Sequence, residues 1–214
     1  MSLVIEEDID QKSTVYEAFY NRYFEGWTEA FEKYKDEVKN VSDIIGKVEK
    51  RTNGYYPSKS KLFDCFEKTP LDKVKVVIWT EYPFSLDRSY PNVYKELKNQ
   101  YSEFTCPREN NLLKLTEQGI LFINASMCYA RFKKAYDNLW FRFTNIVIEI
   151  LNERVDNCIH LLWGRNCQKL SDNINSREVY ISSDPISYTF FGNNHFIKTN
   201  ITLKRQGKPE IKWT

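Results

Sequence analysis

The stretch VKVVIWTEYPFS, residues 74–85, decides the fold class of this chain. Apart from Lys75, its first six residues are apolar, which is typical of a strand buried on both faces. The run ends near Pro83, where we expect a turn. Ligands of open α/β sheets bind beyond the carboxyl ends of the strands, so the residues from Thr80 to Ser85 are the first candidates for a functional site.

Three further short apolar runs follow along the chain, at residues 120–123, 158–163 and 178–181. Amphipathic helical patterns alternate with these runs or follow them, at residues 91–100, 111–118, 136–151 and 195–205. Four buried strands alternating with helices require βα crossovers and therefore a parallel sheet. The sequence predicts the α/β class, as a three-layer αβα fold around a central four-stranded parallel sheet.

The part of the chain before the first strand is expected to be helical. Aromatic residues recur at helical spacing from Tyr16 to Tyr34, and Thr14 and Glu17 stand in the positions of a capping box. This pattern predicts one long helix whose rings pack in the core. We expect residues 1–12 to form a flexible arm and residues 13–214 to form a single domain.

The composition limits which partners, metal sites and cellular locations we expect. Lys and Arg total 31 against 29 Asp and Glu, a net charge of +2, so charge alone does not indicate a polyanionic partner. The 5 cysteines form no CxxC pair, which favours free thiols over a metal site, and nothing indicates a cofactor. Without a signal peptide or a long apolar run, we expect no membrane contact and an intracellular, non-secreted protein.

Polar and aromatic residues follow each predicted strand. They are Glu81, Tyr82, Phe84, Asn124, Gly164, Arg165, Ser182 and Asp184. In a parallel sheet the carboxyl ends of the strands share one edge, so we expect these residues to gather at one rim. The two histidines, His160 and His195, are expected in core or capping positions instead.

Six segments in sequence order resemble the family 1 uracil-DNA glycosylases, over about residues 23–213. They are TPLDKVKVVI (69–78), NVYKEL (92–97), QGILFINA (118–125), LLWG (161–164), DPIS (184–187) and FFGNNHFIKTN (190–200). The resemblance implies the uracil-DNA glycosylase fold. It also implies a DNA partner, because that family turns a uracil out of the duplex and cleaves its glycosidic bond.

The resemblance also shows which catalytic groups differ. The family's G-Q-D-P-Y-H loop falls on TEYPFS, so Tyr82 stands at the position of the catalytic aspartate. The H-P-S-P-L-S loop falls on SSDPIS, so Ser182 stands at the catalytic histidine and Ile186 at the wedging leucine. No intact catalytic pair is expected. Glu81 is the candidate replacement carboxylate, although neighbouring residues on a strand point in opposite directions and a slip of the turn would be needed.

The resemblance assigns the remaining positions to two groups. Candidates for the base pocket are Glu81, Phe84 and Asn124, of which Asn124 matches the family's uracil-reading asparagine. Candidates for DNA contact are Ser89, Gly164, Arg165, Ile186 and Ser187. Asp184 replaces a phosphate-contacting serine, and a carboxylate facing a phosphate is repulsive.

Two functions are compatible with these residues. The leading hypothesis is a catalytically inactive protein with the glycosylase fold that binds DNA, a protein partner or both, in DNA replication, repair or genome maintenance. Its basis is the replacement of both catalytic residues. The alternative is a divergent DNA glycosylase, for uracil or another base, that uses Glu81 or a water held by the substrate.

Overall fold

The computed structural model describes residues 13–50, 56–106, 113–129 and 138–213. Helices and strands follow one another as α2 (Val15–Tyr20), α3 (Trp27–Phe31), α4 (Lys35–Glu49), α5 (Asp64–Lys68), β1 (Val76–Thr80), α6 (Pro83–Gln100), α7 (Leu113–Thr116), β2 (Ile120–Asn124), α8 (Phe141–Arg154), β3 (Ile159–Trp163), α9 (Arg165–Gln168), β4 (Val179–Ser182) and α10 (His195–Arg205). The expected arm, residues 1–12, lies outside the described residues.

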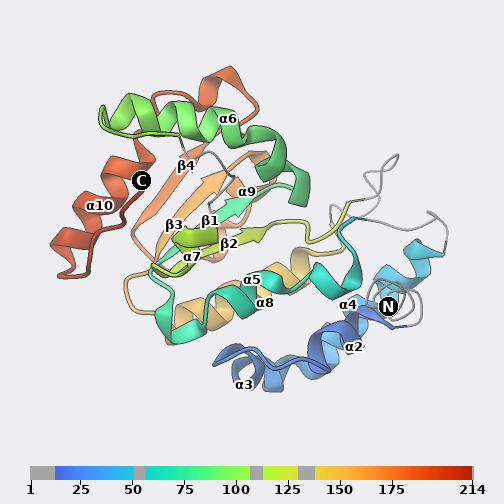
Figure 1. The fold of residues 1–214 in the computed structure, drawn as a ribbon. Helices are drawn as coiled ribbons and strands as arrows, with labels where there is room; N and C mark the ends of the chain where they lie inside the picture. Colours follow the sequence, from blue (N-terminus) through green and yellow to red (C-terminus); the bar gives the residue numbers. More distant parts are fainter. Residues whose placement is uncertain (1–12, 51–55, 107–112, 130–137, 214) are drawn as a thin grey trace, which may run out of the picture.

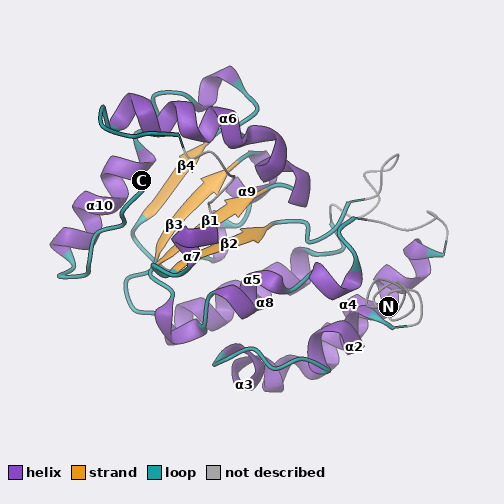
Figure 2. Ribbon diagram, in the orientation of Figure 1, coloured by secondary structure: helices purple, strands orange, loops and turns teal. Residues whose placement is uncertain are grey.

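The four strands form one parallel sheet in the order β2-β1-β3-β4 (Figure 2). Thr80 at the end of β1 is paired with Asn124 at the end of β2. Trp163 at the end of β3 is paired with Ser182 at the end of β4. The predicted four-stranded parallel sheet is confirmed, and its carboxyl ends meet at one rim.

Strand β1 is buried on both faces because its alternate side chains enter two different cores. Val77 and Trp79 pack in the core that includes α2 to α5 and α8. Val76 and Ile78 pack in the core that includes residues of α6 and α10. In Figure 1, α6 and α10 lie on one side of the sheet and α5 and α8 on the other. The predicted three-layer arrangement is therefore confirmed.

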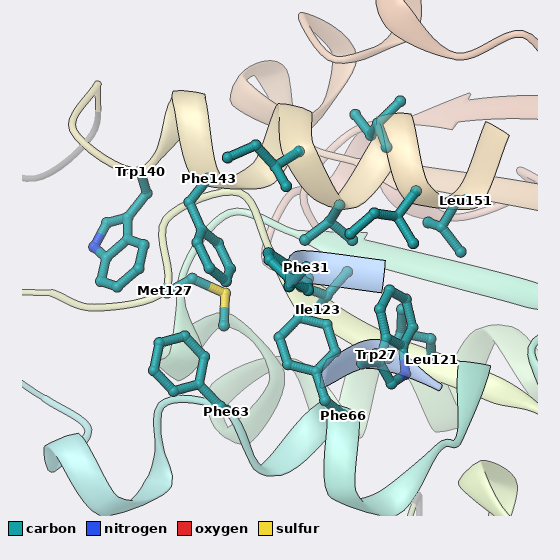
Figure 3. Packing of buried hydrophobic residues seen from close by; sticks show 14 of the residues in the cluster. Trp27, Phe31, Phe63, Phe66, Leu121, Ile123, Met127, Trp140, Phe143 and Leu151 are labelled. Atoms are coloured by element: carbon teal, nitrogen blue, oxygen red, sulfur yellow. The ribbon is translucent and has the colours of Figure 1, made fainter. Parts of the chain in front are cut away.

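The first of these cores is built largely from aromatic rings (Figure 3). The ring of Phe31 lies 4.7 Å from that of Phe19 and 5.4 Å from that of Phe143, measured between centroids. Phe66 of α5 contacts the same rings and is fully buried. The expected packing of the aromatic residues in the core is confirmed, whereas Tyr23 is 66% exposed.

The prediction of one long N-terminal helix is wrong. The helix ends at Tyr20, and α3 begins only at Trp27, with a short 3-10 turn joining α3 to α4. Between them Gly26 has φ +74, and a Cβ on it would lie 2.9 Å from Leu71 Cβ. Helical residues have negative φ, so the chain turns at this glycine. The capping box of Thr14 and Glu17 is confirmed.

The bounds of three further helices differ from those expected. Helix α6 begins at Pro83 rather than at Pro91, which lies inside it, so the helix predicted over residues 91–100 is too short at its N-terminal end. Proline fits the first turn of a helix, and Pro83 provides that start directly after β1. Helix α7 is shorter than the predicted 111–118, and α8 begins and ends later than the predicted 136–151. Residues 111–112 and 136–137 lie outside the described part. Helix α10 has the predicted bounds.

The two histidines are core residues, as the sequence predicts. Trp79 Nε1 donates to His160 Nδ1 at 3.2 Å, and Trp163 Nε1 donates to His195 Nδ1 at 3.0 Å. Burial lowers the pKa of His160 to about 4. Burial and the charge of Lys198 lower the pKa of His195 to about 4. Both rings are therefore neutral acceptors at neutral pH.

Candidate functional site

The turns that follow the strands are held side by side at the rim. Ala125 N–H donates to the carbonyl of Thr80 at 2.8 Å, and Ser126 N–H donates to that of Glu81 at 3.1 Å. On the other side, Gly164 N–H donates to the carbonyl of Ser182 at 3.0 Å. The strand pairing thus continues into the turns and brings the predicted site residues of all four strands to one edge.

Glu81 extends from the end of β1 towards the end of β3. Its Oε1 accepts a hydrogen bond from Asn166 N–H at 3.0 Å. Gly164, with φ +107, lies under the side chain, and a Cβ there would lie 2.5 Å from Glu81 Cγ. Within the described residues, Oε2 of Glu81 has no hydrogen-bond partner. This carboxylate is half-buried and keeps one oxygen available to a water or a ligand.

Asp184, after β4, is a second carboxylate whose charge acts on the same buried thiol as that of Glu81. Burial raises the pKa of the Cys167 thiol well above its usual value, and the charges of Glu81 and Asp184 raise it further. The charges of both carboxylates therefore act on the same thiol of α9. Asp184 is one of the residues expected at this rim, and β4 lies beside β3 in the sheet.

Tyr82 and Ser182, at the positions of the family's catalytic pair, have different surroundings. The Tyr82 ring packs edge-on against Tyr129, after β2, with 5.6 Å between centroids. Glu81 thus lies against the end of β3, whereas the Tyr82 ring lies against the segment that follows β2. Ser182 is buried, and its carbonyl accepts hydrogen bonds from Gly164 N–H and from Gln168 Nε2.

Asn124 is held by Thr80 from the neighbouring strand. Thr80 is 2% exposed, and its hydroxyl donates to Asn124 Oδ1 at 2.5 Å. Among the residues that the structure describes, none accepts a hydrogen bond from Asn124 Nδ2. The amide is therefore oriented, and its two N–H donors remain for an acceptor at the rim.

The loop after β4 presents apolar side chains to solvent. Ile186 is 57% exposed and Tyr188 is 90% exposed. The loop is tied to α6, because Asn92 Nδ2 donates to the carbonyl of Pro185 at 2.8 Å. The hydroxyl of Ser187 lies 2.8 Å from Thr189 Oγ1, within the loop. Tyr188 was not predicted from the sequence, although a large aromatic residue directly after the DPIS segment was a usable signal.

The other predicted DNA-contact residues lie at two places. Arg165, the first residue of α9, is exposed and forms no ion pair with any described residue. Ser89 is in α6, as is Phe84, which was predicted for the base pocket, and the side chains of both lie outside the described part of the structure.

The described residues hold neither a group that could bind a metal ion nor a helix that could span a membrane. They contain no group of three or more His, Cys, Asp or Glu residues that could hold a metal ion. Nor is any helix in them long and apolar enough to cross a membrane.

Comparison with known proteins identifies the family. No protein-family model matches the chain. The chain is 32% identical over 217 residues to the uracil-DNA glycosylase of Haemophilus influenzae (strain 86-028NP), an alignment that covers 82% of this chain and 99% of that protein. This chain belongs to the uracil-DNA glycosylase family. The uracil-DNA glycosylase of Pectobacterium carotovorum is also 32% identical, over 210 residues covering 86% of this chain and 92% of the relative.

Solved structures agree on the fold of this family member. The crystal structure of mimivirus uracil-DNA glycosylase has a TM-score of 0.81 at 22% identity, covering 98% of this chain and 92% of that one. Mimivirus UNG Y322L, in complex with UGI, has a TM-score of 0.78 at 23% identity, and the match covers 95% of this chain and 92% of that one. The relatives are named as glycosylases, which favours the divergent-glycosylase alternative over the non-enzymatic hypothesis.

Proposed function

We propose that this family member is a divergent DNA glycosylase of base-excision repair, which cleaves the glycosidic bond of uracil or another base in DNA. Family membership supports the reaction class. The observation that carries the proposal is Glu81: a half-buried carboxylate at the centre of the rim, fixed through one oxygen by Asn166 N–H, whose other oxygen has no hydrogen-bond partner among the described residues.

The proposed chemistry needs a negative charge beside the sugar. As the bond between the base and the sugar breaks, the sugar becomes cationic and the departing base becomes anionic. Oε2 of Glu81 orients the attacking water and stabilises the cation. The Nδ2 donors of Asn124 face the acceptor edge of the base and stabilise its charge. The water adds to the sugar carbon, and its proton neutralises the released base.

The reaction is expected to be slow. Ser182 is buried beneath the rim and replaces the family's imidazole donor. Loss of one such donor reduces a rate by about two to three orders of magnitude. Single-turnover conditions with excess protein are therefore needed to measure base release.

The test is release of uracil from a single-stranded oligonucleotide by the wild-type chain, Glu81→Gln and Glu117→Gln. The glutamine at 81 keeps an oxygen for Asn166 N–H and removes only the charge. Glu117 is exposed at the opposite end of the sheet and serves as the matched control. We expect release by the wild type and by Glu117→Gln, and a fall of about a hundredfold or more in Glu81→Gln.

A second candidate function is binding of DNA without base release. Its specific support is the tyrosine and the serine at the family's catalytic positions, Tyr82 and Ser182. It predicts no base release, together with DNA affinity that falls steeply with salt. Arg165→Ala would then reduce the salt slope by about 1, while the exposed-lysine control Lys204→Ala on α10 would not. If neither release nor DNA binding is measured, docking of a protein partner becomes the remaining proposal.

A further inference from the structure

A pocket of about 530 Å³ lies at the amino ends of the strands, the opposite end of the sheet from the rim. Its walls come from the segments that precede β1, β2 and β3 and from the segment after α10. The side chains that decide its chemistry are Lys73, Lys75, Glu117, Arg154, Asp156 and Lys208. No part of the mechanism proposed above uses this pocket.

Two half-buried lysines bring positive charge into the pocket without a carboxylate partner. Lys75 Nζ donates to the carbonyl of Pro209 at 3.0 Å. Lys208 Nζ donates to the carbonyl of Asp156 at 2.8 Å. Neither ammonium forms an ion pair with a described residue. Each has three donors, so both have donors left over for a ligand.

The position of Lys75 is fixed and electrostatically unfavourable. Its stem lies over Gly119, where a Cβ would be 3.1 Å from Lys75 Cγ and where φ is +84. Burial and the positive charge of Lys208 lower the pKa of Lys75. An anion between the two ammonium groups would relieve this repulsion.

The carboxylates of the pocket do not compensate this charge. Asp72, Glu117 and Asp156 are all exposed to solvent. Asp72 is already paired with Lys73 at 2.7 Å. Arg154, also at the edge, forms no ion pair with the residues that the structure describes. The half-buried charges of this cationic pocket are therefore two ammonium groups, and the Arg154 guanidinium at its edge has no ion pair among the described residues.

We propose that this pocket binds the phosphate group of a small phosphorylated ligand of about the size of a mononucleotide. A phosphate monoester carries close to two negative charges at neutral pH, which match the ammonium groups of Lys75 and Lys208. The planar guanidinium of Arg154 suits the oxygens of the same group. The volume falls within the usual range of small-molecule sites, about 300 to 1,000 Å³.

The test is isothermal titration calorimetry of the full chain with deoxyuridine monophosphate, deoxyuridine and inorganic phosphate, at low salt. The variants are Lys75→Met with Lys208→Met, which keeps the apolar stems, and the exposed-lysine control Lys204→Met. We expect the monophosphate to bind with a Kd below about 1 mM. Inorganic phosphate should bind more weakly, and the nucleoside should not bind. The double variant should lose at least tenfold in affinity, and Lys204→Met should retain it.

Three results would overturn the proposal. They are no binding of the monophosphate at 10 mM, equal affinity in the double variant, or lysine-dependent binding of an oligonucleotide alone. If the double variant has a lowered melting temperature, Lys208→Met alone replaces it, because this residue follows the last helix. Competition separates this site from the rim: monophosphate binding here should survive Glu81→Gln.

Discussion

Polar side chains inside the sheet and at its carboxyl-end rim differ in how completely they are hydrogen-bonded. Inside, the indole N–H groups of Trp79 and Trp163 are each satisfied by a neutral histidine. At the rim, Glu81 and Asn124 are each held through one polar atom and keep another without a described partner. Buried polar groups left unpaired are costly, so proteins pair them unless a water or a ligand completes them. The interior thus pairs these donors, whereas the rim keeps hydrogen-bonding atoms for which the described residues supply no partner.

The largest effect is expected in the interior. Phe66 is fully buried against Phe19, Trp27 and Phe143. Phe66→Ala should reduce the free energy of unfolding by about 3 to 5 kcal/mol, because it removes a ring and leaves a cavity. Urea denaturation measures this. A loss below about 1 kcal/mol would contradict the packing described here. Phe66→Leu, which fills most of the space, is the milder control.

The lowered pKa values of the two buried histidines predict that the free energy of unfolding falls at acid pH. The folded pKa of each is about 4, below the ordinary 6.5, so the unfolded chain takes up protons first as the pH falls. Their contribution to stability is complete above about pH 6.5 and is lost as the pH falls through about 4. Each adds a slope of about 1.4 kcal/mol per pH unit within this window.

Denaturant unfolding at several pH values tests this dependence. His195→Gln keeps an acceptor for Trp163 and cannot titrate in this range. Its unfolding free energy should depend less steeply on pH than that of the wild type, by about 1.4 kcal/mol per unit. An unchanged slope would show that His195 does not contribute to the acid sensitivity.

A smaller effect is expected at the rim itself. Gly164→Ala places a Cβ against Glu81 and holds a non-glycine residue at φ +107, which should cost about 1 to 3 kcal/mol. Glu81→Ala in the same chain should recover the part that is due to the collision. A double-mutant cycle from denaturation curves measures this coupling. Fully additive effects would mean that Glu81 does not rest on Gly164.

Much of the fold could be predicted from the sequence, because buried parallel strands and the helix at 195–205 have strong local patterns. The break at Gly26 was missed because aromatic residues continue at helical spacing across it, and only the backbone conformation of the glycine reveals it. The start of α6 at Pro83 was missed because two prolines fit a first turn and Pro91 was taken as the start.

The site was less predictable than the fold. The gathering of Glu81, Asn124 and Ser182 at one rim follows from the parallel sheet and could be predicted. The direction of Glu81 towards Gly164 depends on the order of the strands, which local patterns do not contain. The cationic pocket has the same origin, since Lys75 and Lys208 are 133 positions apart (208 − 75) and meet only in the folded chain.

The most direct test of the central claim is the rate of uracil release under single-turnover conditions, measured side by side for the wild type and Glu81→Gln. Equal melting temperatures would establish that both variants are folded. The account predicts slow but measurable release by the wild type and a loss of about a hundredfold or more in the variant. No release by the wild type, or equal release by both, would contradict a catalytic role for Glu81.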